Sequence, residues 1–214
     1  MDKYLKEILK YKPTGKHLDI GCAYGYMLEL TSQAGYDAQG IDPSHYAINQ
    51  APEHLKNKVM QGTIFDMEFS DKTFDVITML DVFEHLDNPL SELKEINRIL
   101  KDDGILLLST GDSGSIASKI LKRKWTFYNP PQHLFFFNTQ TIKLILKNSD
   151  FEITKWFRVG KWLNLQYIIH LAKTTAELPV LKPILSFINS SNLGTIPIYI
   201  NLRDNMVIIA KKSN

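Results

Sequence analysis

The feature that most restricts the fold is an alternation of short apolar segments with amphipathic segments along the chain. The run Ile105–Leu108 is continuously apolar, as in strands that are buried on both faces of a parallel sheet. Alternating strands and helices require right-handed crossovers, which place helices on both faces of one sheet. The sequence therefore predicts an α/β fold, a three-layer, doubly wound, Rossmann-like sandwich. The predicted strands are 18–20, 36–41, 59–60, 74–79, 105–108, 151–159 and 205–210, and the clearest helices are 2–10, 89–100 and 139–148.

Composition excludes several classes of protein. The 214 residues carry 25 Lys and Arg against 23 Asp and Glu, and this near-balanced charge argues against a nucleic-acid binder. The single cysteine, Cys22, excludes an internal disulfide and a cysteine-rich zinc module. No apolar run approaches the roughly 18 residues of a membrane span, and charges interrupt the start where a signal peptide is apolar. A cytoplasmic location is expected.

A glycine turn follows the first predicted strand. Gly21 and Gly25 allow a tight turn and bring peptide N–H groups close to a ligand. A dinucleotide fingerprint requires Gly-x-Gly-x-x-Gly, but Ala23 and Tyr26 stand at the other two glycine positions. Asp42 ends the second strand, where a carboxylate accepts hydrogen bonds from ribose hydroxyls. This pattern favours a nucleoside ligand without a pyrophosphate, so a dinucleotide oxidoreductase ranks last.

Five blocks in this order and spacing resemble the class I S-adenosylmethionine-dependent methyltransferases. They are His17–Gly25, Gly40–Ser44, Gln61–Thr63, Phe74–Leu86 and Ile96–Gly104. The resemblance implies a seven-stranded sheet with an antiparallel last strand, and S-adenosylmethionine as the cofactor. It also implies one domain over 1–214, in which 16–110 bind the cofactor and 111–137 and 160–204 are insertions on the substrate side.

The resemblance further implies which residues contact the cofactor. Asp19 and the glycine turn would lie near its amino-acid half, Asp42 on the ribose, and Thr63 and Ile64 beside the adenine. Two departures from the family are Ala23, where a third glycine is frequent, and Thr63, where Asp is frequent. The complete predicted set is Asp19, Gly21, Cys22, Ala23, Gly25, Asp42, Pro43, Thr63, Ile64, Met79, Leu80 and Asp81.

An acidic and histidine cluster follows the fourth strand, beside the expected position of the transferred methyl. Methyl transfer needs positioning of the acceptor, and a base when the acceptor is a hydroxyl, a role that suits His85. Alternatively, Glu84 and His85 only hold the loop and contact the edge of the cofactor. A third interpretation is a metal site, because Asp81, Glu84 and His85 resemble the Glu-x-x-Glu-His cluster of the ubiquinone-pathway O-methyltransferases and the small-RNA 2′-O-methyltransferases. Such ligands suit Mg²⁺, Mn²⁺ or Zn²⁺.

The segment 111–137 contains a second histidine and a basic run. Its end resembles a subgroup of the family with a Pro-x-His-Leu-x-Phe-Phe insertion, whose members act on sugars, glycans and other small metabolites. His133 in this motif is the preferred general base or substrate-orienting residue, and it could also complete a metal site with His85; the alternative is a buried structural histidine. The basic run predicts either a clamp for an anionic substrate or a solvated helix face. Its residues are Lys119, Lys122, Arg123 and Lys124.

The segment 163–200 is almost uncharged, with only Lys173, Glu177 and Lys182. Apolar residues at helical spacing predict helices beginning near Leu163 and near Leu181. Such a segment suits a lid over the substrate pocket, the preferred interpretation because it lies between the last two predicted strands, where the resembled fold places substrate-specific insertions; the alternatives are a homodimer contact and a surface for an apolar carrier lipid.

Taken together, these patterns predict an enzyme that methylates an oxygen of a small metabolite or sugar, with an anionic or sugar-like acceptor. N-methylation is the nearest alternative reaction. A catalytically silent, cofactor-binding partner subunit is the alternative from another class.

Overall fold

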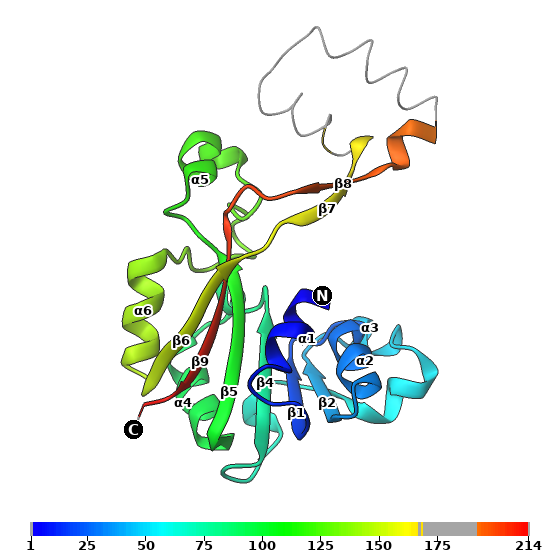
Figure 1. The fold of residues 1–214 in the computed structure, drawn as a ribbon, viewed down its shortest axis with the longest axis vertical. Helices are drawn as coiled ribbons and strands as arrows, with labels where there is room; N and C mark the ends of the chain where they lie inside the picture. The colour runs from blue at the N-terminus through cyan, green and yellow to red at the C-terminus, as the bar shows by residue number, and fades with distance from the viewer. Residues whose placement is uncertain (1, 167, 169–191, 214) are drawn as a thin grey trace, which may run out of the picture.

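The computed structural model describes residues 2–166, 168 and 192–213. Seven strands form one sheet in the order β3-β2-β1-β4-β5-β9-β6 (Figure 1). β9 runs antiparallel to both of its neighbours, whereas the pairs among β1 to β5 are parallel. The strands are β1 (Lys16–Ile20), β2 (Asp37–Asp42), β3 (Val59–Gln61), β4 (Phe74–Leu80), β5 (Leu100–Gly111), β6 (Phe151–Arg158) and β9 (Asn205–Lys212). The predicted fold class is confirmed.

Helices cover both faces of this sheet. α1 (Asp2–Ile8) and α2 (Tyr26–Gln33) pack on one face, and α4 (Pro89–Ile99) and α6 (Thr139–Lys147) pack on the other. The remaining helical segments are short: α3 (His45–Asn49), α5 (Ile116–Leu121), η1 (Glu53–Lys58), η2 (Ile64–Asp66), η3 (Phe83–His85), η4 (Lys122–Lys124) and η5 (Asn192–Thr195).

The central position of β5 in the sheet explains why Ile105–Leu108 is continuously apolar. Leu106 and Leu108 pack in the core beneath α4 and α6, whereas Ile105 and Leu107 pack in the core beneath α1 and α2. All four side chains are fully buried. Because successive side chains of a strand point to opposite faces, both cores need an apolar residue at every position.

β5 begins earlier than the sequence predicts. Residues 101–104, which suggest a turn, belong to the strand, and the pairing with β4 shifts register between Phe74 and Val76. This irregularity leaves Asp102 and Asp103 exposed at the start of β5, where lysine side chains pair with them. The local Asp-Asp-Gly signal is overridden because Leu100 is buried opposite Phe74.

The described parts of the two predicted insertions lie beyond the carboxyl ends of the parallel strands, at one end of the long axis (Figure 1). The first carries α5 and η4. The second contains a two-stranded antiparallel sheet of β7 (Lys161–Asn164) and β8 (Pro197–Ile200). Leu163 lies in strand β7, where it pairs with Ile198, and helical residues begin at Leu165, two positions after the predicted start. The helix predicted near Leu181 lies outside the described residues.

In the part of the chain that the structure describes, no helix has the length and hydropathy needed to cross a bilayer.

Candidate active site

The turn after β1 packs closely against the end of β2 and against the side chain of Val82. Gly21 has φ +71°, and its N–H donates to the carbonyl oxygen of Ile41 over 2.8 Å. A Cβ at this glycine would lie 2.2 Å from Cγ2 of Val82, so no larger residue fits. Ala23 has φ +46°, which costs about 1 kcal/mol relative to glycine. This explains in physical terms why a third glycine is frequent at that position.

Asp42 joins this turn to the loop after β2. One carboxylate oxygen accepts from the N–H of Ala23 over 2.9 Å, and the other accepts from the N–H of Ser44 over 2.8 Å. Each oxygen has a second lone pair, so the predicted bonds to ribose hydroxyls remain available. Asp42 thereby orders both loops before any ligand binds.

A cleft of about 450 Å³ opens beside these loops. Gly21, Pro43, Thr63 and Ile64, four of the predicted cofactor residues, line it. Sequence analysis missed Phe65, a half-exposed aromatic side chain in the wall. The signal available for it was an aromatic residue directly after the predicted adenine contacts. The other lining residues are Ile20, Ile41, Gly62, Val82, His85, Leu86, Asp87, Asn88, Ser91 and Glu92.

Four other predicted cofactor residues, Cys22, Met79, Leu80 and Asp81, do not line this cleft. Met79 is fully buried in the core. Cys22 is also buried, and burial raises the pKa of its thiol to about 12, so the thiol stays neutral. Leu80 and Asp81 line a second cavity of about 400 Å³. Its other lining residues are Tyr4, Val159, Gly160, Trp162 and Asn205.

Asp81 is held by polar side chains of the neighbouring strands. Its Oδ1 accepts from the hydroxyl of Ser109 over 2.8 Å and from the amide of Asn205 over 3.2 Å. Burial, and then the charge of Asp81, raise the pKa of Tyr4. The Asp81 carboxylate therefore supplies negative charge to the second cavity.

A buried hydrogen-bonded chain supports Asp19. The hydroxyl of Thr78 donates to Asp19, and Nε2 of His17 lies 2.8 Å from the same hydroxyl. Burial raises the pKa of Asp19 to about 7 and lowers that of His17 to about 3. When Asp19 is ionised, it accepts the proton of the Thr78 hydroxyl; a neutral His17 then donates from Nε2 to Thr78, and its Nδ1 faces the hydroxyl of Thr31 at 2.9 Å. Sequence analysis missed the contact of His17 with Thr78, because it depends on the pairing of β1 with β4, which are far apart in the sequence.

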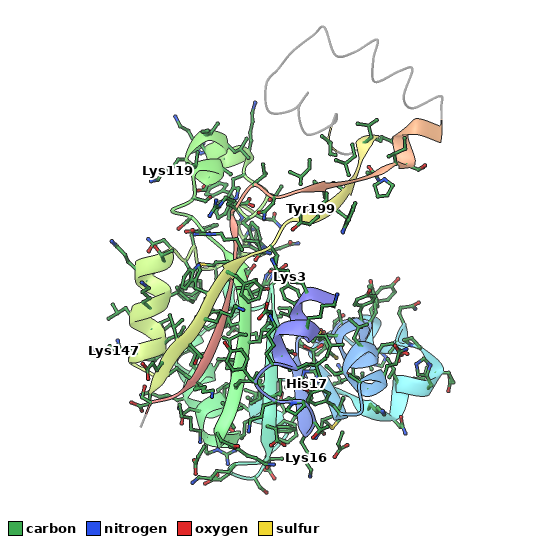
Figure 2. The ribbon with its side chains drawn as sticks, in the orientation of Figure 1. Lys3, Lys16, His17, Lys119, Lys147 and Tyr199 are labelled. Atoms are coloured by element: carbon green, nitrogen blue, oxygen red, sulfur yellow. The ribbon has the colours of Figure 1, made fainter. Side chains whose placement is uncertain are left out.

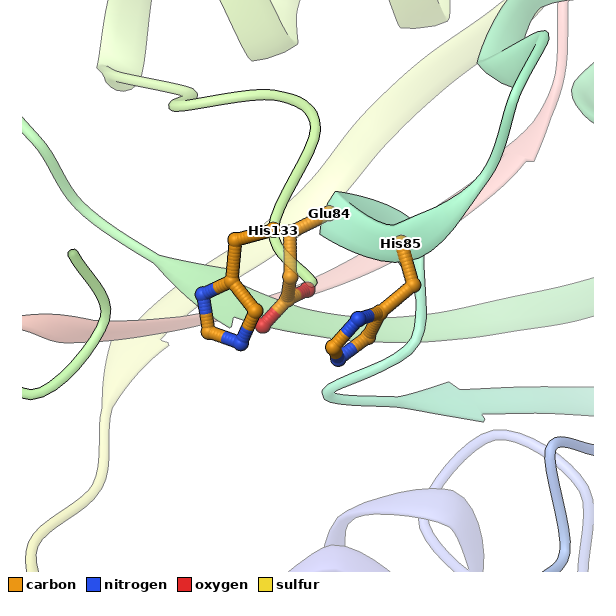
Figure 3. Close-up of side chains that lie close together, drawn as sticks. All are labelled: Glu84, His85 and His133. Atoms are coloured by element: carbon orange, nitrogen blue, oxygen red, sulfur yellow. The ribbon is translucent and has the colours of Figure 1, made fainter. Parts of the chain in front are cut away.

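Among the described residues, the side chains of Glu84, His85 and His133 lie close enough together to hold a metal ion (Figure 3). One ligand atom from each lies within 4.8 Å of the others. The imidazole rings of His85 and His133 meet edge to face, with their centroids 4.5 Å apart. The structure thus brings the two predicted candidate bases together.

Backbone carbonyls fix the tautomers of both histidines. Nδ1 of His85 lies 2.8 Å from the carbonyl oxygen of Gln132, and Nδ1 of His133 lies 2.6 Å from that of Phe127. A carbonyl only accepts hydrogen bonds, so each Nδ1 carries a proton. In the neutral rings, both Nε2 atoms therefore hold a lone pair.

Glu84 is almost completely buried beside these rings. Its Oε2 accepts from the hydroxyl of Thr110 over 2.8 Å, but Oε1 has no hydrogen-bond partner among the described residues. Burial, reinforced by the charge of Asp81, raises the pKa of Glu84. Its backbone carbonyl also accepts from the N–H groups of Leu134 and Phe135, which anchors the segment that carries His133.

The close group differs from the predicted metal-binding set. His133 joins Glu84 and His85, while Asp81 bonds to Ser109 and Asn205. The short spacing between Asp81 and Glu84 in the sequence suggested that they bind one ion together. In the structure, Asp81 has a left-handed backbone, at φ +54°, and the chain turns after it.

Comparison with known proteins identifies the class. A family model described as a methyltransferase domain matches residues 1–155, so the chain belongs to the methyltransferase domain family. This confirms the family predicted from the motifs, and the fold is the one found in its S-adenosylmethionine-dependent members.

Several particular proteins are similar to the chain. A ubiquinone biosynthesis O-methyltransferase of Haemophilus ducreyi is 34% identical over 105 residues, which cover 44% of each protein. The match thus spans under half of that relative's length. An uncharacterized protein of Methanocaldococcus jannaschii is 27% identical over 73% of this chain and 67% of its own length. A solved S-adenosylmethionine-dependent methyltransferase of Archaeoglobus fulgidus superimposes with a TM-score of 0.64 and 21% identity, covering 99% and 95% of the two chains.

The contact between Gly21 and Val82 generates a first prediction. Gly21→Ala should lower stability by several kcal/mol, at the upper end for a single substitution, and should abolish binding of S-adenosylmethionine. Gly35→Ala is the matched control, since Gly35 has φ +90° with nothing within 4 Å of the added Cβ, and should cost only about 1 kcal/mol. Urea unfolding and calorimetry measure both. Equal effects of the two substitutions would contradict the close-approach explanation.

The raised pKa of Asp19 generates a second prediction. If the ammonium group of S-adenosylmethionine binds near Asp19, its affinity should rise with pH as this carboxyl ionises and level off above pH 7. The rise should reach at most about tenfold per pH unit. Calorimetry between pH 5.5 and 8 measures it. Asp19→Asn should flatten the profile, while Asp37→Asn, at an exposed site, should not; an unchanged profile in Asp19→Asn would refute the assignment.

Proposed function

We propose that the protein is an S-adenosylmethionine-dependent O-methyltransferase that acts on a hydroxyl group of a small metabolite. The observation that carries this proposal is the group of Glu84, His85 and His133 beside the cleft lined by Gly21, Pro43 and Ile64. A hydroxyl acceptor must lose a proton as it attacks the methyl carbon, and this group offers two proton acceptors. The name of the Haemophilus relative, an O-methyltransferase, agrees with an oxygen acceptor.

Catalysis begins with alignment of the two substrates. The loops tied together by Asp42 hold the nucleoside, and Asp19 attracts the amino-acid half of the cofactor. The acceptor then approaches from the side of the insertion that carries His133. Because the methyl carbon is already activated by the sulfonium, correct distance and direction supply most of the rate enhancement.

His133 is the proposed general base. Its Nδ1–H donates to the carbonyl of Phe127, so Nε2 takes the hydroxyl proton while the acceptor oxygen forms its bond to the methyl carbon. The bond from that carbon to sulfur breaks, and S-adenosylhomocysteine leaves. The unpartnered Oε1 of Glu84 stabilises the imidazolium that forms, as a carboxylate does in other catalytic groups.

The same group also fits a divalent cation. One ring nitrogen of each histidine and one carboxylate oxygen of Glu84 lie close together, and Oε1 of Glu84 has no hydrogen-bond donor among the described residues, an arrangement that a cation would satisfy. Backbone bonds to both Nδ1 atoms orient the rings as partners of metal ligands do. Glu84, His85 and His133 would hold Zn²⁺ or Mn²⁺ more readily than Mg²⁺, which prefers oxygen. A bound cation would lower the pKa of the acceptor hydroxyl.

A third prediction tests the base. His133→Gln should lower turnover by about 10²–10⁴-fold and leave S-adenosylmethionine affinity within twofold, roughly. His54→Gln, at an exposed histidine that pairs with Glu29, is the matched control and should remain active. Release of S-adenosylhomocysteine on a panel of phenols, sugars, phosphorylated sugars and amines measures turnover. Cofactor binding without turnover on any acceptor would indicate a silent subunit, and turnover on amines alone would indicate N-methylation.

A fourth prediction distinguishes the general-base mechanism from a metal-dependent mechanism. If a cation is bound, purified protein should contain about one equivalent of metal, and Glu84→Gln and His85→Gln should both lose it. A chelator should then abolish turnover, and added Zn²⁺ or Mn²⁺ should restore it. Turnover that is insensitive to chelator in metal-free protein would exclude the cation and leave His133 as the base.

A further inference from the structure

Helix α5 buries serine side chains and exposes isoleucine side chains. Its serine Ser118 and the preceding cap Ser115 are buried, whereas Ile116 and Ile120 are 77% and 73% exposed. The hydroxyl of Ser118 donates inward to the carbonyls of Ser113 and Ser115. Positions four residues apart share one helix face, so the two isoleucines form an outward apolar ridge. Such a ridge is absent from an ordinary surface helix, which buries its apolar side.

Cations surround this ridge. Lys119, Lys122, Arg123 and Lys124 are all exposed. The described residues of the insertions, 111–137, 160–166, 168 and 192–204, contain only two carboxylates, and both are buried. Asp112 pairs with Arg158 over 2.6 Å, and Asp204 accepts from the indole of Trp125 over 2.8 Å. The exposed charge of these segments is therefore positive, although the whole chain is nearly neutral.

The β7–β8 sheet adds aromatic side chains at the same end of the molecule (Figures 1 and 2). Trp162 and Tyr199 are 69% and 47% exposed, with ring centroids 5.4 Å apart. Ile196 and Arg203 nearby in the chain are exposed as well. Trp and Tyr are the residues that favour the boundary between lipid headgroups and acyl chains.

We propose that this end of the molecule docks on the surface of an anionic lipid bilayer. The docking surface comprises α5, η4 and the β7–β8 sheet. The cations would contact lipid phosphates, and Ile116, Ile120 and Trp162 would enter the headgroup boundary, the two contributions that make interfacial binding stable. This proposal concerns a surface and does not depend on the reaction proposed above.

The charge pattern favours a bilayer over a second copy of the chain. A symmetric dimer through α5 would place the same cations against each other, because a twofold interface joins a patch to itself. A bilayer supplies the opposite charge together with an apolar layer below it. RNA supplies the charge but leaves the exposed isoleucines in water.

Vesicle flotation tests the proposal with the complete protein. Protein should float with vesicles of phosphatidylcholine and phosphatidylglycerol, and far less with phosphatidylcholine alone. Lys119→Gln/Arg123→Gln should lower partitioning by roughly 25-fold, from about 5-fold for each cation. Ile116→Ser/Ile120→Ser should lower it at least tenfold, at about 1.4 kcal/mol or more of lost apolar burial. Both pairs are exposed, and circular dichroism verifies their folding.

Helix α6 provides a matched control. Lys143, Leu144 and Lys147 are also exposed there, but α6 packs its apolar side on the sheet. Lys143→Gln/Lys147→Gln and Leu144→Ser should leave flotation unchanged. Absence of the wild type from anionic vesicles, or equal losses in the α5 and α6 variants, would overturn the proposal. Binding to an RNA oligonucleotide or to another protein chain without vesicle binding would likewise replace it.

Discussion

The parallel pairing of β1 with β2 and β4 is the constraint on which the site depends. In this register, Asp19 lies opposite Thr78, and Ile20 lies between Ile41 and Met79. The three chains therefore leave the sheet at one edge and turn over one another. Gly21 must pass beneath Val82, and Asp42 can reach the N–H of Ala23 only because the two strands end level. A one-residue slip would separate all of these groups.

The same edge concentrates buried carboxylates, and their environments differ. Asp42 has two backbone donors, whereas Asp19 depends on one threonine hydroxyl and Glu84 on another. Burial raises the pKa values of Asp19 and Glu84, so their charged forms are costly without a ligand. A cationic ligand beside either carboxylate would remove part of that cost. The buried carboxylates of the folded protein therefore carry an unfavourable desolvation free energy at the positions where a cofactor and an acceptor are proposed to meet.

The alternating strands and helices of the layered sheet could be predicted because periodicity and turn residues are local signals, whereas the antiparallel last strand was implied by the family resemblance. Gly21 and Asp42 followed from motif spacing, and Thr63 and Ile64 from the family resemblance; Gly21, Thr63 and Ile64 line the same cleft. The partnership of Glu84 with His133 could not be predicted as firmly, since their contact depends on backbone bonds from Leu134 and Phe135 across a long insertion. Strand β7 was not predicted because its partner β8 lies far along the chain, and only the start of the helix predicted from Leu163 falls in it.

The position of β9 has a consequence for synthesis of the protein. β9 is the last strand in the chain, but it lies between β5 and β6, which make no pair with each other. As the chain leaves the ribosome, β5 therefore has an open edge until residues 205–212 emerge, and β6 has no strand to join. A nascent chain in this interval exposes an apolar strand edge, the kind of surface that chaperones bind. The sheet is therefore completed late, when β9 pairs with β5 and β6.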